Sequence, residues 1–493
     1  MLSLRDRRAP RGSRARRPRL ESLEGRLVLS AVFDSVLDVG NDTASIFPKD
    51  VAVDSAGNRY VTGLLYGQMD MDPNVERPDG SDILTPLGSQ AGYVAKYAPD
   101  NTLLWARAIG SSYQRSTNPN DPFEQGRSIA VDASGNVYVS GDFVGQVSFG
   151  STVLTGTGST DAYVTKLDTN GNYLWAQRWG SSSTREFANA ITVDASGNVY
   201  SAGFTANLTS TGAWWASGFE IRKYSPSGAA VWDKRFNNAG GIADAVGTDA
   251  AGNVYVCGSF NGTLDFNPDP RKTSYVTGAS GYSGGQAFNG FVLKLTSSGA
   301  FSRVSPFIAK ASNSRISCQD LALDGAGNVI VGGTYSGQVD VNPSSSVDTR
   351  LPNLTTSDGY VAKLSSSGAL SWATPLGGAT VWGIDVDAAG SIYATGTFYE
   401  TLIPGSGLPS VTTQGSNDVF LTKFNATGSV AWVSTIGGTG TDLCYAVAVG
   451  TDGSIHLAGV FYSTVDFDPD AIGTHQVTNT KFGDMFLLRL TQS

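Results

Sequence analysis

The octapeptide VDASGNVY occurs twice in this chain of 493 residues, at 131–138 and at 193–200. Its underlying pattern, Asp-x-x-Gly followed by Asn or Ser, recurs at six regularly spaced positions, and a seventh copy has Gly450 where the others have aspartate. The mean spacing of the seven copies is 66 residues. The six aspartates are Asp54, Asp132, Asp194, Asp249, Asp324 and Asp387. A fixed period of this kind is typical of repeat architectures and constrains the fold more than any other feature of the sequence.

Each copy of the phrase lies between residues that favour β-strands, such as IAVD before it and NVYVSGDF after it. Aspartate closes an Asx turn, and glycine supplies the left-handed residue that a tight hairpin requires. The phrase therefore predicts a strand, a tight turn and a second strand in every copy.

A second anchor follows each copy, an apolar run with one basic residue, as in YVAKY, EIRKY and FLLRL. The basic residues are Lys96, Lys166, Lys223, Lys294, Lys363, Lys423 and Arg489. Nine residues after each of the first six come Trp105, Trp175, Trp232, Arg303, Trp372 and Trp432. Each copy thus predicts four strands, which we name A, B, C and D in chain order.

Seven such units predict an all-β fold, a seven-bladed β-propeller with four antiparallel strands per blade. An open solenoid is the main alternative. The last copy stops at strand C, whereas a lone strand, AVFDSVLDVG at 31–40, precedes the first copy. We therefore expect the N-terminal strand to complete the last blade and close the ring, which removes two exposed sheet edges. This assigns residues 31–493 to the propeller and residues 1–30 to a basic, disordered N-terminal or targeting segment.

The repeats over residues 31–493 resemble the seven-bladed β-propeller repeat family abbreviated SBBP, which occurs in many bacterial surface and secreted proteins. The segment LEGRLVLS at 23–30 is similar to the LEPR-XLL segment that opens many large planctomycete proteins, although Gly25 stands where that motif has Pro and Val28 where it has Leu. The resemblance implies a propeller fold and an extracellular or cell-surface location. It implies no particular activity, because one fold carries many functions.

The charge distribution argues against a nucleic-acid partner. The whole chain carries a net charge of −9 and residues 1–30 carry +6, so the remainder carries −15. An acidic body repels phosphate, which nucleic-acid binding requires it to attract. No run of eighteen apolar residues occurs, so we expect no transmembrane segment. The three cysteines, Cys257, Cys318 and Cys444, have neither the number of a disulfide framework nor the spacing of a metal site, and we interpret them as buried strand residues. We expect the protein to be a monomer.

Loop lengths single out one face of the expected propeller. The A–B turn is short in every copy, and the C–D turn is constant because the basic residue and the D-strand position lie nine residues apart. The B–C and D–A connections vary, with the longest insertions at 66–92, 110–126 and 262–289. In an up-and-down blade these two connections share one face, which we name the variable face. We expect it to bind a partner, because scaffolds diversify their binding loops; the alternative is neutral drift in loops that touch nothing.

Four B–C connections carry an alternation of acidic residues that resembles the start of a calcium loop. The candidate ligands are Asp70, Asp72, Asp265, Asp269, Asp466, Asp468 and Asp470, with a related sequence at Asp340. The glycine and the distal glutamate of a complete calcium loop are missing. The favoured alternative is an Asx turn that leaves strand B, with Ca²⁺ otherwise the one cofactor to consider.

Binding candidates on the variable face are Trp214 and Trp215 in a B–C loop, together with Arg271 and Tyr282 in the longest insertion. The tryptophan pair suggests an aromatic platform for a sugar, and burial against a neighbouring blade is the alternative. The segment 281–285 fits G-x-S-x-G, but it lies in a Gly/Ser-rich loop with no helix to form a nucleophile elbow. With only two histidines, His456 and His475, few catalytic triads or metal sites can be built, and we assign no catalytic residue.

Features that recur in every unit are interpreted as structural. The A-strand aspartates and C-strand lysines are expected to form ion pairs or a solvated rim, and the D-strand tryptophans to pack the outer part of each blade. The sequence as a whole predicts a non-catalytic binding or scaffold protein that presents its variable face to a protein or a glycan. Alternatives are a carboxylate- or tyrosine-based lyase or hydrolase on the same face, and a structural protein of the cell envelope.

Overall fold

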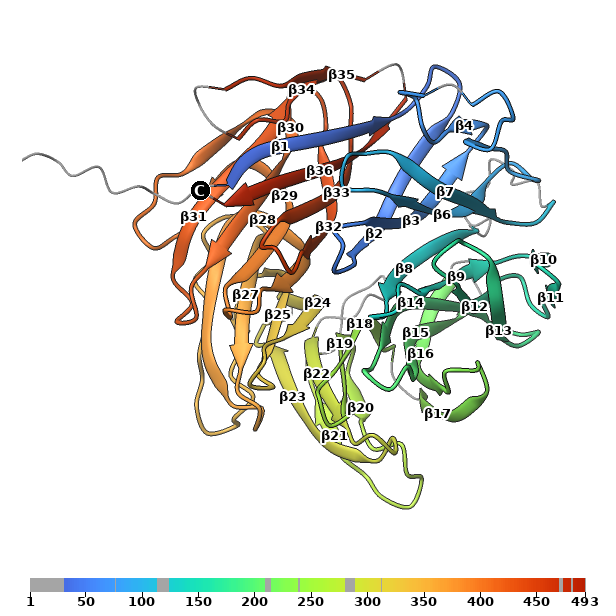
Figure 1. The fold of residues 1–493 in the computed structure, drawn as a ribbon. Coiled ribbons are helices and arrows are strands. Elements are labelled where there is room, and N and C mark those ends of the chain that lie inside the picture. The colour runs from blue at the N-terminus through green and yellow to red at the C-terminus, as the bar shows by residue number, and fades with distance from the viewer. Residues whose placement is uncertain are drawn as a thin grey trace, which may run out of the picture.

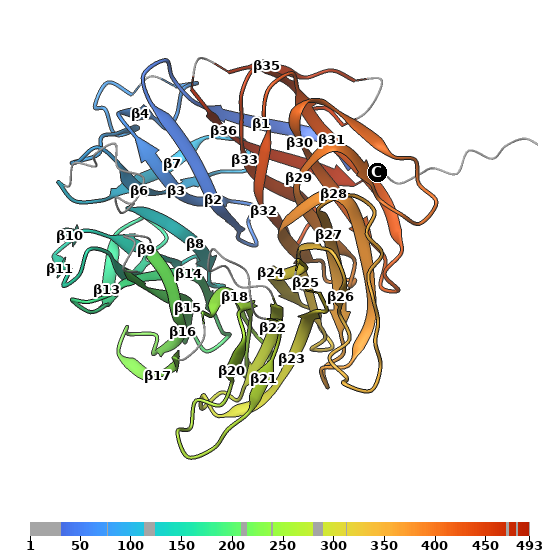
Figure 2. The ribbon, with the colours of Figure 1, turned by 180° about the vertical axis from the view of Figure 1, so that it is seen from behind.

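The computed structural model describes residues 31–75, 77–112, 124–208, 214–237, 240–279, 289–311, 313–469, 473–479 and 482–492. Residues 1–30, with the motif-like segment at 23–30, lie outside this description. The strands gather into sheets arranged around a central axis, and the colour sequence runs once around the ring (Figures 1 and 2). The all-β propeller predicted from the sequence is confirmed.

The described strands follow the predicted order A, B, C and D, and we number the units 1 to 7 along the chain. Units 1 and 2 comprise β2 (Ser45–Val53), β3 (Arg59–Tyr66), β6 (Ala91–Tyr97) and β7 (Leu103–Ile109), then β8 (Gln125–Val131), β9 (Val137–Phe143), β12 (Asp161–Leu167) and β13 (Tyr173–Trp179). Units 3 and 4 comprise β14 (Arg185–Val193), β15 (Val199–Leu208), β16 (Trp214–Tyr224) and β17 (Ala230–Asn237), then β18 (Ile242–Thr248), β19 (Val254–Phe260), β22 (Asn289–Leu295) and β23 (Phe301–Ala309).

Units 5 and 6 comprise β24 (Arg315–Leu323), β25 (Val329–Ser336), β27 (Asp358–Leu364), β28 (Leu370–Val386), β29 (Ile392–Ile403), β30 (Val411–Phe424) and β31 (Val430–Gly438). Unit 7 comprises β32 (Leu443–Val449), β33 (Ile455–Phe461), β36 (Asp484–Gln492) and the N-terminal β1 (Ala31–Val39). Short strands lie in the B–C connections: β4 (Met69–Asp70), β5 (Ile83–Leu84), β10 (Gln146–Phe149), β11 (Thr152–Thr155), β20 (Thr263–Asp265), β21 (Tyr275–Thr277), β26 (Val339–Asp340), β34 (Thr464–Asp466) and β35 (Gln476–Thr478).

Five units, namely 1, 2, 3, 4 and 7, form separate blades of four or five strands, so the prediction of seven separate blades requires correction. The strands of units 5 and 6 belong to one nine-stranded sheet. The cause is β28, which runs without a break from the outer strand of unit 5 into the inner strand of unit 6. Its residues up to Leu376 pair with β27, and those from Gly377 onward pair with β29.

The predicted pairing of the N-terminal strand with the end of the chain is confirmed. Antiparallel pairing joins β1 to β36 from Ala31 opposite Gln492 to Val39 opposite Met485, and blue β1 lies beside red β36 in both views (Figures 1 and 2). Each inner strand contacts the next around the ring, and β32 contacts β2. The ring is thus closed by strands from the two ends of the described chain.

The repeated phrase forms the same turn in successive units. In unit 3, Oδ1 of Asp194 accepts hydrogen bonds from the backbone N–H groups of Ser196 and Asn198, at 2.9 Å each. Its Oδ2 accepts from the Asn198 side chain at 2.8 Å and from the Tyr200 hydroxyl at 2.9 Å. Gly197 adopts a φ of 78°, a left-handed conformation that costs glycine little. The two copies of VDASGNVY are therefore identical because they build identical turns.

The D-strand tryptophans connect neighbouring units. The indole N–H of Trp105 donates to the backbone carbonyl of Thr169 at 3.0 Å, and that of Trp175 donates to Pro226 at 3.2 Å. Each acceptor lies in the C–D turn of the next unit, and a glycine of that turn, such as Gly171, lies against the ring. The expected packing role of these tryptophans is confirmed.

Candidate functional site

The inner strands line a central channel with a volume of about 1360 Å³. Toward the A–B turns its lining is mainly small and apolar, as at Val53, Ala130, Val131, Ala448 and Val449. Toward the variable face the lining is polar, charged and aromatic. The change of character along the channel places the chemically diverse part at the end where the sequence predicts binding.

A β-bulge interrupts the register of every inner strand, for example between Pro48 and Asp50 and between Val381 and Gly383. The extra residues all line the channel, and we name them the bulge ring: Lys49, Arg127, Asn189, Asp244, Gln319, Trp382 and Tyr445. Bulges next to binding sites re-aim side chains. The seven units thus share one backbone device and differ in every side chain that it presents.

Part of the bulge ring is connected by polar contacts. Arg127 donates to the Asn189 side chain at 3.2 Å, and Asn189 donates to the Asp244 carboxylate at 3.4 Å. The Lys49 ammonium lies 4.8 Å from the centre of the Tyr445 ring, within the range of a cation–π contact. These contacts hold cationic, amide and acidic groups in a fixed order around the channel.

Burial alters the protonation of several groups in the channel wall. It raises the pKa of Asp244 to about 7 and that of Asp320 to about 8, because a carboxylate loses its hydration there. Burial also lowers the pKa of Lys49, and the nearby Arg127 cation lowers it further. Asp320 additionally accepts the backbone N–H of Ile384 in the next unit at 2.7 Å, so it stabilises the contact between inner strands.

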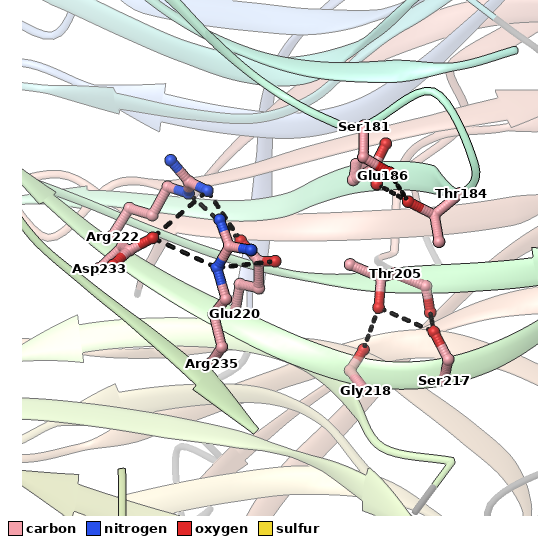
Figure 3. A network of polar contacts seen from close by, with 10 residues as sticks. All are labelled: Ser181, Thr184, Glu186, Thr205, Ser217, Gly218, Glu220, Arg222, Asp233 and Arg235. Atoms are coloured by element: carbon pink, nitrogen blue, oxygen red, sulfur yellow. Dashed lines mark hydrogen bonds and ion pairs between the residues drawn. The ribbon is translucent and has the colours of Figure 1, made fainter. Parts of the chain in front are cut away.

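A second cavity, of about 650 Å³, lies between units 2 and 3. Its lining comes from the end of β13 and from all four strands of unit 3. Figure 3 shows the polar contacts of this region in separate groups: Ser181, Thr184 and Glu186; Thr205, Ser217 and Gly218; and Glu220, Arg222, Asp233 and Arg235. We name this cavity the 2–3 cleft.

The 2–3 cleft exists because unit 3 departs from the repeat in strand C. Three residues before the basic anchor, the other units have a fully buried aromatic residue, namely Tyr93, Tyr163, Phe291, Tyr360, Phe420 and Phe486. Unit 3 has Glu220 there. Elsewhere this aromatic packs toward the preceding unit, as where the Tyr93 hydroxyl lies 3.1 Å from the sulfur of Met485 in unit 7. Glutamate does not fill the same space, and a cavity remains.

Charged residues of unit 3 form a network along this cleft (Figure 3). Glu220 accepts from Arg222 at 3.0 Å and lies 3.5 Å from Arg235. Asp233 bridges the same two arginines at 3.7 and 3.3 Å. The Arg222 guanidinium also lies over the ring of Trp179, 4.7 Å from its centre. The network joins the outer strand of unit 2 to unit 3 where other units have apolar packing.

The structure places the calcium candidates in turns. Oδ1 of Asp70 accepts the N–H of Asp72 at 2.9 Å, and Asp265 and Asp466 accept the N–H two residues on at 3.0 and 3.1 Å. These are the Asx turns given as the alternative, and Asp72 pairs with Arg77 and Asp269 with Arg271. Among the described residues, no three His, Cys, Asp or Glu side chains gather as metal ligands. Asp470 lies outside the described residues.

The remaining predicted site residues do not converge. Trp214 and Trp215 begin β16 and pair with Leu208 and Asn207, so their assignment to a loop requires correction: the B–C hairpin of unit 3 continues as strand. Their side chains, Tyr282 and the whole of 281–285 fall outside the described parts of the chain. Arg271 is exposed in a B–C connection and pairs with Asp269 at 3.0 Å.

The lysines of the C-strand anchors serve structural roles, as expected for a feature present in every unit. Lys363 pairs with Asp324 at 2.8 Å and Lys294 with Asp249 at 3.4 Å. Others lie over the tyrosine of strand B, as Lys96 does over Tyr60 at 5.0 Å. Neither the bulge ring nor the charges of unit 3 were predicted as site residues, although Glu220 is visible in the anchor EIRKY, where other units have Tyr or Phe.

Within the described part of the chain, no helix has the length and apolar character needed to cross a membrane. No family model matches the sequence. An uncharacterized WD repeat-containing protein, L264 of Acanthamoeba polyphaga mimivirus, is 24% identical over 467 residues, covering 77% of this chain. This chain spans only about a third (32%) of the length of that relative.

The solved structures that are similar to this chain share little sequence identity with it. A polysaccharide lyase of family PL25, an ulvan lyase, is 10% identical with a TM-score of 0.44 and covers 92% of this chain and 97% of its own. The Dos1 propeller is 8% identical with a TM-score of 0.42, covering 93% and 95%. A chain of the mitotic checkpoint complex is 8% identical with a TM-score of 0.43, covering 100% and 99%.

Proposed function

We propose that this chain is a non-catalytic β-propeller binding protein whose partner, a protein segment or a glycan, enters the central channel from the variable face. The observation that carries the proposal is the bulge ring. Its seven positions are equivalent in the repeat, yet they hold two cations, an acid, two amides and two aromatic side chains.

The diversity of the bulge ring argues for a binding role rather than a structural one. Where the repeat needs only stability, as in the turn at Asp132 and Asp194, its units are identical. A channel wall that binds no partner would not need a different side chain at the bulge position of every unit. The channel volume of about 1360 Å³ exceeds that of a usual small-molecule pocket, which suits an extended segment of a larger partner.

We further propose that the ring functions as a seven-bladed propeller, with the nine-stranded sheet serving as two blades joined by β28. A separate hydrophobic cluster supports this count: it packs Val361 and Leu376 of unit 5 against Phe420 of unit 6. The resemblance to SBBP repeats and to the LEPR-XLL segment favours a monomeric protein exported to the cell surface or exterior of a bacterium. A structural envelope role is the less specific alternative.

Catalysis is the second candidate, and one observation favours it: burial holds the pKa of Asp244 at about 7, in the range of a general acid or base. The substrate would be an acidic or hydroxylated polymer, and the reaction an elimination or a hydrolysis. We favour binding because Asp244 accepts a hydrogen bond from the Asn189 amide, and Arg127 is held by Asn189 and by the carboxylate of Asp142. Among the described residues, no hydroxyl or thiol is in hydrogen-bond contact with Asp244.

A photo-crosslinking side chain at position 382 tests the proposal, because Trp382 is 39% exposed within the channel wall. The matched control places the same group at Leu174, which is 52% exposed on outer strand β13. We expect a covalent adduct with a protein or a glycan from the native source at position 382 only, and loss of that adduct in Arg127→Ala. Equal labelling at both positions contradicts the proposal. Release of an unsaturated or shortened polysaccharide favours the catalytic alternative.

A further inference from the structure

Unit 3 differs from the other units at the 2–3 cleft, because it alone replaces the aromatic residue before the basic anchor by a charged one. Two further positions change with it. Arg222 stands where other units have Ala, Thr or Leu, and Asp233 stands where they have Ala or Val. A feature used once in a repeat protein is a better candidate for recognition than one used in every unit.

Two residues that line this cleft each have a buried polar atom with no hydrogen-bond partner among the described residues. These atoms are the indole Nε1 of Trp179, a donor, and Oε2 of Glu186, an acceptor. The two residues are only 2% and 3% exposed. Leaving such groups unpaired costs free energy, so native structures pair nearly all of them. A ligand that satisfies both groups gains this energy on binding.

The charge of the cleft excludes a strongly anionic ligand. Arg222 and Arg235 are already paired with Glu220 and Asp233, and Arg178 pairs with Asp161 at 2.8 Å. The carboxylate left without a cation is that of Glu186, whose pKa is raised by burial and by the nearby acids Asp161 and Glu220. An added anion would face these three carboxylates with no free arginine to bind it.

A cationic ligand fits no better. Its one acidic partner without a cation is Glu186, and burial raises the pKa of that carboxyl, which disfavours its charged form. Arg222 already occupies a face of the Trp179 ring, so a ligand cation cannot use that face. What remains is a neutral ligand that offers both donors and acceptors. The rest of the lining has the same dual character, since it includes Ser181, Thr184, Thr205 and Ser217 and the amides Asn207 and Asn237. A sugar hydroxyl donates one hydrogen bond and accepts two, which matches a lining of this kind.

We propose that the 2–3 cleft binds a neutral carbohydrate, with one hydroxyl donating to Glu186 and another accepting from the indole N–H of Trp179. The volume of about 650 Å³ lies within the range of small-molecule sites and accommodates about one or two sugar rings. The ligand is held by hydrogen bonds to planar and hydroxylic side chains, and the Glu220–Arg222–Asp233–Arg235 network fixes the wall opposite Glu186.

The cleft is separate from the channel. No residue lines both cavities. Phe204 and Ala206 of β15 line the channel, whereas Thr205 and Asn207 of the same strand line the cleft, because successive residues of a strand point to opposite faces. The proposal adds a second site to the binding protein proposed above. It rests on that proposed function in one respect only, namely that the chain binds its ligand without reacting with it.

The test is isothermal titration calorimetry of the full chain with neutral pyranosides, namely glucose, galactose, mannose, rhamnose and their disaccharides, beside glucuronate and glucosamine. Trp179→Phe removes the indole N–H and keeps an aromatic ring. The double variant Glu220→Tyr/Arg222→Thr introduces the pair found in unit 2, Tyr163 and Thr165, and fills the cleft. Leu174→Ala, at an exposed position of β13 outside both cavities, is the control. Trp382→Phe, in the channel, distinguishes binding in the cleft from binding in the channel.

We expect at least one neutral sugar to bind, with affinity at least tenfold weaker in Trp179→Phe, undetectable in the filled variant and unchanged in Leu174→Ala. The proposal is overturned if no neutral sugar binds, if only the charged sugars bind, or if the filled variant binds as the wild type does. Loss of sugar binding in Trp382→Phe alone also overturns it and assigns the sugar to the channel. Melting temperatures of all variants confirm that each is folded. Failure here leaves the crosslinking result at position 382 unaffected, so the two proposals fail separately.

Discussion

The junction between units 2 and 3 and the junction between units 3 and 4 share the strands of unit 3 but differ in how their side chains pack. At the 3–4 junction Phe219 stacks on Phe236 at 4.3 Å and on Phe291 at 5.1 Å, and Phe266 completes a closed aromatic cluster. At the 2–3 junction the hydrophobic contacts are divided into two small clusters, with the cleft and its arginines beside them.

The difference has a simple origin in strand geometry. Four other units have a small residue followed by an aromatic one at this point of strand C, as in Ala162–Tyr163 and Gly290–Phe291. Unit 3 has Phe219 followed by Glu220. A shift of one residue moves a side chain to the opposite face of a sheet. The aromatic group of unit 3 therefore closes the junction ahead of it and leaves the junction behind it open. One change of order in the sequence explains both junctions.

The largest effect is expected from opening the ring, because every junction depends on closure. Val39→Asp places a carboxylate at a fully buried position of β1 opposite Met485, and we expect a loss of more than about 4 kcal/mol in the free energy of unfolding. Val32→Asp, on the same strand but 38% exposed, should cost less than about 0.5 kcal/mol. Chemical denaturation measures both, and equal losses would mean that β1 does not close the ring.

The difference between the 2–3 and 3–4 junctions is tested by truncating the side chain at the same position of the repeat in units 3 and 4. Phe291→Ala removes a fully buried ring from the 3–4 junction and should cost about 3–5 kcal/mol. Glu220→Ala, at the same position of the repeat, should cost less, about 1–2 kcal/mol, because Glu220 is buried but Asp233 remains to pair with Arg222 and Arg235. Urea titrations of the two variants give both values. Similar costs at the two positions would show that the 2–3 junction is as tightly packed as its neighbour.

Filling the cleft should stabilise the protein. Glu220→Tyr/Arg222→Thr buries an aromatic side chain between units 2 and 3, and we expect a gain of about 1–2 kcal/mol. Thermal unfolding measures this gain. The same tyrosine at an exposed position of unit 3, in Val231→Tyr, should leave the melting temperature unchanged. A destabilised double variant would mean that the ion network contributes more than apolar packing does.

The smallest effect concerns pH. The pKa of Glu186 is raised in the folded protein, mainly by burial, so the folded state binds its proton more tightly than the unfolded state does. Stability contributed by the protonated group is therefore present at low pH and lost as the pH rises from the unfolded value through the folded one. Glu186→Gln should flatten this dependence, by at most about 1.4 kcal/mol per pH unit.

Melting curves recorded from pH 4 upward measure the slope of stability against pH, and Asp42→Asn is the control at an exposed carboxylate. The Phe-lined 3–4 junction has no equivalent acid, and Gly241 occupies the corresponding position of unit 4. An unchanged slope in Glu186→Gln would contradict the assignment of a buried carboxyl group with a raised pKa to the 2–3 junction.

The sequence predicted the features that repeat. The turn at each Asp-x-x-Gly, the order of the four strands and the pairing of β1 with β36 all follow from patterns present in several copies. The continuous strand β28 could not be predicted in the same way. The chain at 370–386 contains Gly377 and Gly378, which suggest a turn, yet the structure continues the strand through them with Gly378 at a φ of 71°.

The site was harder to predict for the opposite reason. Every inner strand has a bulge, so the bulge does not change the spacing of the anchors from one unit to the next. The residues at the bulge, such as Lys49, Arg127 and Trp382, have different side chains, so a search for repeated residues does not detect them. The charges of the 2–3 cleft do leave a signal, because EIRKY differs from YVAKY and YVTKL at the position of Glu220. Interpreting that signal requires knowing which face of β16 meets which neighbour.

The pairing of β1 with β36 also sets an order of events during synthesis. The N-terminal strand leaves the ribosome first, and its partner lies more than 440 residues later in the chain. Until β36 is made, the apolar side chains of Leu37 and Val39 have no unit to join, although other units form from neighbours in sequence. The ring can therefore be completed only after β36 has been synthesised, and a product that ends before β36 would carry an open sheet edge that chaperones and proteases recognise.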